Sequence, residues 1–148
     1  MKKWLALLVW LGGASLAHAD LWVNPGFYSY HFQRDKGFNN VNTGLGVETS
    51  ITDQYAFTAV FFENSDRQTS RYVGVYAMPW KYGHVKLGAA IGAFDGYPKM
   101  RDGGWFPAII PTAAIEGQRF GLNINVIPTV GDKLHGAITF QVKYNLAP

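Results

Sequence analysis

Two short stretches of this chain carry the residue types that could do chemistry, one around His31 and one around Ser65. Glu63 and Asp66 lie close to the serine in the sequence, so its hydroxyl stands among acidic side chains. An imidazole that reaches a hydroxyl can accept its proton while a neighbouring group orients the ring, which is the basis of acyl transfer. His31 and Ser65 are therefore our candidate catalytic residues. The plainer alternatives are that His31 is a hydrogen-bonded filler and that Ser65 forms a turn.

The elements that must position these residues are strands. After Asp20 the chain shows no apolar period of 3.6 residues, whereas strand-like runs recur with turn residues between them. The run from Ile138 to Leu146 alternates apolar and polar residues throughout, which is typical of a strand between an apolar phase and water. We predict eight strands: Gly26 to Arg34, Thr43 to Ile51, Gln54 to Glu63, Arg71 to Pro79, Gly83 to Phe94, Phe106 to Ile115, Phe120 to Ile127 and Gly136 to Leu146.

The connections between these strands alternate in length. Short connections follow the second, fourth and sixth strands, and longer ones follow the first, third, fifth and seventh. This is the pattern of an outer-membrane barrel with short periplasmic turns and longer outside loops. We predict an all-β fold, an eight-stranded antiparallel up-and-down transmembrane β-barrel, in which an even strand count leaves no open edge. Such a closed barrel is expected to be a monomer.

The N-terminus predicts export from the cytoplasm. Lys2 and Lys3 precede the apolar run Trp4 to Leu11, and Ala17-His18-Ala19 forms a small-x-small cleavage site before Asp20. The apolar run is too short to span a bilayer as a helix, so we expect residues 1–19 to be a cleaved signal peptide. Residues 20–148 would then form a single domain in the bacterial outer membrane.

Composition excludes several classes of protein. The chain has no cysteine, which rules out a disulfide scaffold, a thiol enzyme and a lipoprotein anchored through cysteine. Two of its 13 basic residues belong to the signal peptide, so the mature chain nearly balances its 10 acidic residues. It has no basic stripe or recognition motif for nucleic acid. We expect no cofactor, no metal and no nucleic-acid partner. The aromatic content of 16% suits the interfacial girdles of a barrel, and an ordinary β-sandwich core could also account for it.

Alternation assigns the two faces of most strands, but not of the third and sixth. The outward set contains residues such as Tyr28, Leu45 and Phe140, and His31 faces the lumen in its outer half. Charged residues at the opposite ends of their strands predict a polar floor made of Glu48, Lys86 and Lys143. Six inward glycines either relieve tight curvature or leave a slot for an acyl chain. They are Gly44, Gly46, Gly74, Gly88, Gly92 and Gly121.

Prolines near the outer rim predict a local loss of hydrogen bonding between neighbouring strands of the barrel. Pro107 and Pro111 lie within the sixth strand and Pro128 ends the seventh. Each proline lacks an N–H and removes one hydrogen bond from the ladder. Breaks in neighbouring strands could form a lateral gate through which a lipid tail enters. Simple strand termination is the alternative, and Pro111, inside an apolar run, fits it least well.

Several short motifs resemble the outer-membrane lipid A palmitoyltransferase family of eight-stranded barrels. The first-strand His31 followed by Arg34-Asp35-Lys36, and then Gly44-Leu45-Gly46 in the second strand, is similar to the family's opening. Phe62-Glu63-Asn64-Ser65 resembles its Phe-x-Asp-Ser motif, with Asn64 where the family has Asp. The proline-containing run Phe106 to Pro111 and Ile127-Pro128 resemble its sixth and seventh strands. The family's helix before the first strand has no counterpart in Asp20 to Pro25.

The resemblance implies an enzyme that moves a palmitoyl chain from a phospholipid to lipid A. His31 and Ser65 would carry the chemistry with Asn64 in the family's Asp position, and the glycine-lined lumen, including Gly44, Gly46 and Gly88, would measure the chain. Basic side chains at the same rim could bind lipid A phosphates, because Arg suits bidentate phosphate binding. These are Arg34, Lys36, Arg67 and Arg71. Two alternatives stay open: a non-catalytic barrel that acts through its loops or reinforces the membrane, and a lipid A deacylase.

Overall fold

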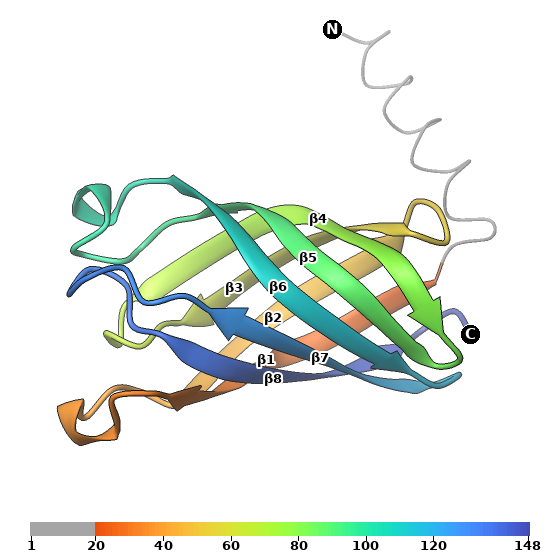
Figure 1. The fold of residues 1–148 in the computed structure, drawn as a ribbon, viewed down its shortest axis with the longest axis horizontal. Helices are drawn as coiled ribbons and strands as arrows, with labels where there is room; N and C mark the ends of the chain where they lie inside the picture. The colour runs from red at the N-terminus through yellow and green to blue at the C-terminus, as the bar shows by residue number, and fades with distance from the viewer. Residues whose placement is uncertain (1–19) are drawn as a thin grey trace, which may run out of the picture.

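The computed structural model describes residues 20–148, which form a closed barrel of eight strands (Figure 1). Each strand is antiparallel to the next, and β1 pairs with β8 to close the ring, so the predicted all-β up-and-down barrel is confirmed. The signal peptide expected at residues 1–19 lies outside the described residues. The strands are β1 (Leu21–His31), β2 (Val41–Ser50), β3 (Tyr55–Glu63), β4 (Thr69–Tyr82), β5 (Val85–Phe94), β6 (Phe106–Glu116), β7 (Phe120–Ile127) and β8 (Ala137–Asn145).

The barrel has two unlike ends. Short turns at 51–54, 83–84 and 117–119 form one end, where Asp20 and the C-terminus also lie, at the right of Figure 1. Longer connections at 32–40, 64–68, 95–105 and 128–136 form the other, and two of them contain the 3-10 helices Arg34–Lys36 and Arg101–Gly103. We call these the turn end and the loop end. Within residues 20–148 no helix is long and apolar enough to cross a membrane.

Two strands run further than the sequence predicts, because bulges carry them through turn-like residues. β1 begins at Leu21 rather than Gly26, and its register against β2 shifts between Asn24 and Gly26. The Gly26 N–H donates to Asn24 Oδ1 at 3.1 Å, and the glycine takes a positive φ of 95° that a side chain would rarely adopt. β4 likewise continues to Tyr82 past Pro79, with a register shift just before Trp80.

The outward face is a continuous apolar band, as alternation predicts. Tyr28, Leu45 and Phe140 are exposed, with exposed fractions of 45%, 55% and 39%. The structure also shows which residues face outward on β3 and β6, the two strands whose faces alternation left unassigned. β3 turns Phe57 and Phe61 outward, while β6 turns Ile109 and Ile115 outward. An exposed belt of this kind is what a bilayer would cover.

The lumen is divided into an apolar half and a polar half. Toward the loop end, aromatic and aliphatic side chains from β3, β4, β5, β6 and the loops form the core cluster. Val60, Phe62, Tyr72, Phe94, Phe106, Ile110 and Leu134 belong to it. Strand alternation predicted mainly polar residues in the lumen, and this apolar core was not anticipated. β3 and β6 supply much of the cluster. Their sequences are apolar at successive positions, so alternation could not tell which residues face the lumen.

The space above the inward glycines is occupied by neighbouring atoms. Gly74 and Gly92 are register partners on β4 and β5, and the Tyr72 ring lies over both of them. A Cβ on Gly74 would collide with the Tyr72 hydroxyl, and one on Gly92 would lie 3.0 Å from the ring. An aromatic ring seated on paired glycines is a known way of stabilising a curved sheet. The glycines therefore accommodate tight packing, and the slot for an acyl chain that they were expected to line is absent from their positions.

The other inward glycines fit the same explanation. A Cβ at Gly46 would lie 2.6 Å from both the Asn24 side chain and the Val60 side chain. Gly44 and Gly88 lie against the backbone of the neighbouring strand, where a Cβ would collide with a carbonyl oxygen. Gly121 makes room for the Lys143 side chain. This corrects the expectation that Gly44, Gly46 and Gly88 shape the acyl site.

A buried ion network closes the polar half of the lumen, as predicted. Lys143, only 1% exposed, donates to Glu48 Oε1 at 2.8 Å. Lys143 also lies 3.7 Å from Glu116, which pairs with Lys86 at 3.1 Å. Glu116 was not anticipated, because the predicted sixth strand ended at Ile115, whereas β6 continues to Glu116. Alternating charges of this kind compensate one another inside the barrel, where an unpaired ion would be costly.

Candidate functional site

His31 and Ser65 lie in hydrogen-bond contact at the loop end, as the sequence predicts for the same rim. His31 is the last residue of β1 and is 3% exposed, while Ser65 lies in the turn between β3 and β4. His31 Nε2 is 2.8 Å from Ser65 Oγ. The contact joins segments that are separated by 34 positions in the chain, and the closed barrel makes it possible because β1 and β3 end at the same rim.

Asn40 is the third member of this group. Its Oδ1 lies 2.7 Å from His31 Nδ1, and an amide oxygen can only accept a hydrogen bond. His31 Nδ1 therefore carries the proton and donates to Asn40, which leaves Nε2 free to accept the proton of the Ser65 hydroxyl. The arrangement of serine, histidine and an orienting amide is that of a nucleophile activated by a positioned general base.

Sequence reasoning missed Asn40 because it lies in a connection, where periodicity carries no information. The loop returns alongside β1, and the Ser29 N–H donates to the Asn40 carbonyl oxygen at 2.7 Å. This backbone contact brings the Asn40 side chain next to His31. The available signal was only that Asn39 and Asn40 form a polar pair shortly after the histidine. Such pairs are common in turns and do not identify a site.

Asn64 has a different role from the one that its motif implies. Its Nδ2 donates to Ser70 Oγ and to the Gly96 carbonyl oxygen, both at 2.8 Å. Its Oδ1 accepts from the backbone N–H groups of Asp66 and Gln68 at 2.9 and 3.1 Å. The side chain is 0% exposed, and its hydrogen bonds stabilise the turn that presents Ser65. The structure therefore brings Asn40, rather than Asn64, to His31.

Replacing Asn64 by Asp should weaken the fold. A carboxylate cannot donate to the Gly96 carbonyl oxygen, so two acceptors would face each other in a buried place. We expect Asn64→Asp to lower the free energy of unfolding by about 1 to 3 kcal/mol, the usual cost of an unsatisfied buried polar group. The measurement is the urea midpoint of the barrel in lipid vesicles, followed by tryptophan fluorescence. Gln68→Glu makes the same charge change on an exposed side chain of this turn and should leave the midpoint unchanged.

A second histidine lies beside the first. The Phe38 ring packs against His31, with centroids 5.0 Å apart, and stacks on His135 at 3.8 Å. His135 Nε2 is 3.2 Å from Asp66 Oδ1, so the loop 128–136 is tied to the turn that carries Ser65. Neither the stacking nor this pair was predicted, since His135 lies in a connection far from both partners in the sequence.

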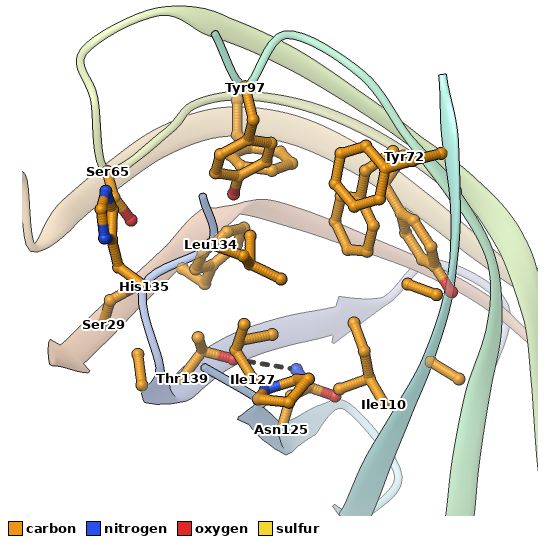
Figure 2. Close-up of a pocket in the computed structure, with 18 of the residues that line it drawn as sticks. Ser29, Ser65, Tyr72, Tyr97, Ile110, Asn125, Ile127, Leu134, His135 and Thr139 are labelled. Carbon is orange, nitrogen blue, oxygen red and sulfur yellow. Dashed lines mark hydrogen bonds between the residues drawn. The ribbon is translucent and has the colours of Figure 1, made fainter. Parts of the chain in front are cut away.

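An apolar cavity of about 250 Å³ opens next to Ser65. Figure 2 shows Ser65 and His135 on one side of it and Tyr72 and Ile110 on the other. Its lining is mostly aromatic and aliphatic, and the glycines of β2 and β5 are not part of it. Tyr76 lines its inner part, and its hydroxyl contacts Asn123 of the polar floor at 3.5 Å. The cavity therefore extends from the candidate serine toward the polar floor.

Two loops narrow the mouth of this cavity. Leu134 from loop 128–136 and Tyr97 from loop 95–105 are buried at 8% exposed each and belong to the core cluster. Burial raises the pKa of the Tyr97 hydroxyl above its usual range, and the negative charge of Asp66 adds to the effect. Tyr97 is therefore neutral under all ordinary conditions. The mouth therefore presents a neutral hydroxyl and apolar surface, with the His135 imidazole beside them.

The four basic residues predicted to bind phosphate do not form one cluster. Arg71 is bound to the Asp95 carboxylate, with its Nε at 2.8 Å. Arg67 donates to the Gly37 carbonyl oxygen at 3.0 Å, which places it beside the loop that carries Arg34 and Lys36. Arg34 lies over the outward Tyr30 ring. Arg34, Lys36 and Arg67 thus share one part of the rim, and Arg71 is already neutralised elsewhere.

The prolines coincide with a break in the barrel wall. β6 and β7 pair only from Thr112 to Glu116, so the part of β6 from Phe106 to Pro111 has no partner on that side. Pro107 and Pro111 point outward on this unpaired part, and Pro128 follows directly after β7. Pro107 and Pro128 also line the apolar cavity. The break therefore adjoins the cavity from the side.

Asn40 should matter for activity through the position of His31. For an acyl-transfer reaction at Ser65, we expect Asn40→Ala to lower the rate by about 10-fold to 100-fold, since small misplacements of a reacting group have effects of this size. Asn40→Asp keeps an oxygen that accepts from Nδ1 and should retain most of the rate. Both variants are compared by turnover of a phospholipid donor at equal amounts of folded barrel. Equal rates for Asn40→Ala and the unaltered protein would contradict this positioning role.

The candidate site consists of Ser65, His31 and Asn40, with an apolar cavity on one side of the serine. The chain matches no protein-family model, and it matches no curated protein.

Proposed function

We propose that this protein is an outer-membrane acyltransferase that moves a palmitoyl chain from a phospholipid to lipid A. The observation that carries the proposal is the hydrogen bond between Ser65 Oγ and His31 Nε2, 2.8 Å long, at the mouth of an apolar cavity. A serine whose proton can pass to an oriented histidine is suited to attack an ester. The adjoining cavity offers a place for the acyl chain of that ester.

The shape of the cavity supports an acyl substrate. Its walls are chiefly apolar, and burying a methylene group against such walls is favourable by about 0.8 kcal/mol. The polar floor around Lys143 and Glu48 lies at its inner end, next to Tyr76. A chain that entered at Ser65 would be limited in length by this floor. The same closed floor argues against a water-filled pore.

The side opening supports entry from a membrane. Because β6 and β7 are unpaired beyond Thr112, a lipid tail could pass between them without breaking a ladder. Pro107 and Pro128 stand at this opening, and Pro111 keeps the exposed strand from offering an N–H to a neighbour. These residues would act as a lateral gate, and the acyl chain of a phospholipid would reach Ser65 from the bilayer.

The outward face and the two unlike ends of the barrel support a location in the outer membrane. The apolar belt would contact lipid, the turn end would face the periplasm, and the loop end with Ser65 would lie at the outer leaflet, where lipid A is found. Arg34, Lys36 and Arg67 would contact lipid A phosphates, whereas the bond to Asp95 withdraws Arg71 from that set. The ring closes between β1 and β8, and the unpaired edge from Phe106 to Pro111 of β6 is short and carries two prolines, which supports a monomer.

The test is to express the protein in a bacterium that lacks its own palmitoyltransferase and to weigh the lipid A by mass spectrometry. The expected result is a gain of one palmitoyl chain. A loss of an acyl chain would identify a deacylase, since the same serine and histidine can transfer the acyl group to water. Unchanged lipid A, with the barrel shown to be folded in the outer membrane by its altered gel migration before boiling, would leave a non-catalytic barrel and reject the proposal.

A further inference from the structure

Ser65 lies between two histidines that occupy different surroundings. His31 and its partner Asn40 line a small polar pocket on the β1 side and are not part of the cavity lining. His135 does line the cavity, and Figure 2 shows it beside Ser65. Phe38 packs against both imidazoles and keeps them apart. A substrate ester that entered the cavity would therefore meet Ser65 and His135, with His31 behind the serine.

The partners of the two histidines differ in charge. His31 Nδ1 faces the neutral amide of Asn40, whereas His135 Nε2 faces the carboxylate of Asp66 at 3.2 Å. The His135 side chain is 11% exposed, so this ion pair is mostly shielded from solvent when the imidazole is protonated. Asp66 follows Ser65 directly in the chain, so the turn that presents the serine also holds His135 in place.

We propose that His135, held by Asp66, is the residue that exchanges protons with the two alcohols of the reaction, while His31 serves Ser65 alone. This rests on the proposed function. His135 lines the cavity together with Ser65, and His31 does not. An ester whose acyl chain entered this cavity would place its leaving alcohol, and later the attacking alcohol of lipid A, on the side of Ser65 that faces His135. His135 is thus a second catalytic histidine, specific for the donor and acceptor hydroxyls.

In the first half of the reaction, His31 Nε2 takes the proton of Ser65, and Ser65 Oγ bonds to the ester carbonyl carbon. The bond between that carbon and the glycerol oxygen of the phospholipid breaks, and the leaving oxygen takes a proton from protonated His135. The products are the acyl ester of Ser65 and the lysophospholipid. His31 is now protonated and His135 is neutral.

In the second half, neutral His135 takes the proton of a lipid A hydroxyl, whose oxygen bonds to the acyl carbon. The bond between that carbon and Ser65 Oγ breaks, and the serine recovers its proton from His31. Both histidines return to their starting states, and one ester and one alcohol have become another ester and another alcohol. The step needs no reactant beyond the phospholipid and lipid A.

The experiment compares two donors that carry the same palmitoyl chain. Dipalmitoyl phosphatidylethanolamine has a poor leaving group that must be protonated, whereas the nitrophenolate of para-nitrophenyl palmitate leaves without a proton. The full-length purified barrel in detergent micelles is mixed with each donor, and product release in the first turnover is timed. The variants are His135→Gln and Asp66→Asn, and the control is His84→Gln, which removes an exposed histidine at the turn end.

The expected result is that His135→Gln slows lysophospholipid release by about 100-fold, the lower range for a lost general acid, but slows nitrophenolate release by no more than about threefold. Asp66→Asn should act in the same direction with a smaller effect. Equal slowing with both donors would show that His135 only shapes the cavity, and no slowing with either would remove it from the reaction. Both outcomes overturn this inference while leaving Ser65 and the proposed function in place. Full transfer activity in Ser65→Ala would reject Ser65 as the nucleophile and this inference with it, whereas no transfer by the unaltered, folded protein would reject the proposed function itself.

Discussion

Palmitoylation of lipid A should fall by at least about 1,000-fold when Ser65 is replaced by Ala, because loss of a nucleophile removes the acyl-enzyme route altogether. His31→Ala should have an effect of similar size. The two losses should not add in the double variant, since serine and histidine act as one unit through the contact between Oγ and Nε2. The rate is measured with purified barrel, a phospholipid donor and lipid A in detergent micelles.

Ser29→Ala is the matched control for this prediction. Ser29 also lines the cavity and is buried at 2% exposed, but its hydroxyl donates to Asn42 Oδ1 and does not contact His31. The Ser29→Ala variant should keep a rate within about threefold of that of the unaltered protein. This change is small compared with the rate loss caused by removing a general base. If Ser29→Ala proved as inactive as Ser65→Ala, the loss would report damage to the rim, and the assignment of Ser65 as nucleophile would lose its support.

Replacing Lys143 by Met should destabilise the barrel by about 3 to 5 kcal/mol, the cost of leaving a buried charge without its partner. Lys143 bonds to Glu48 at 2.8 Å and lies over the Trp22 ring at 4.6 Å, with 1% of its side chain exposed. Without it, Glu48 keeps only the hydrogen bond from Asn123 Nδ2 at 3.0 Å. Urea unfolding in lipid vesicles measures the difference.

A double variant separates charge from packing in this network. Lys143→Met combined with Glu48→Gln removes both ions, so it should recover part of the stability that the single variant loses. Lys133→Met alters an exposed lysine of loop 128–136 and should change stability by less than about 0.5 kcal/mol. A single variant as stable as the Lys133 control would show that the ion network does not hold the lumen closed.

Much of the barrel could be predicted from local pattern. Strand β8 alternates residue by residue, and a face that is apolar at every second position leaves little freedom in how the strand is oriented. Glu48 and Lys143 fall on inward positions of their strands, so their meeting followed from strand parity and barrel closure. Strand ends were less certain, because Asn24-Pro25-Gly26 resembles a turn and forms a bulge instead.

The candidate site was predictable only in part. His31 and Ser65 stand at the ends of strands that rise to the same rim, so their proximity followed from topology. Asn40 and His135 lie in loops, whose paths depend on contacts such as the Ser29 bond to Asn40 and the Phe38 stack on His135. Such contacts leave no period in the sequence. Asn64 is the opposite case. Its place in the motif Phe62 to Ser65 suggested a catalytic role, but its hydrogen bonds show a structural one.

The sequence by itself determined the barrel, the inward and outward faces of six of its strands and the end at which His31 and Ser65 lie, because these depend on alternation and on connection lengths. Only the tertiary structure decided which polar group orients His31, what fills the space above the glycines and where the apolar cavity lies. Those features depend on side chains from strands and loops that are distant in the chain. Tyr72 over Gly74 and Gly92, and Asn40 beside His31, become neighbours only when the ring closes and the loops fold back onto it.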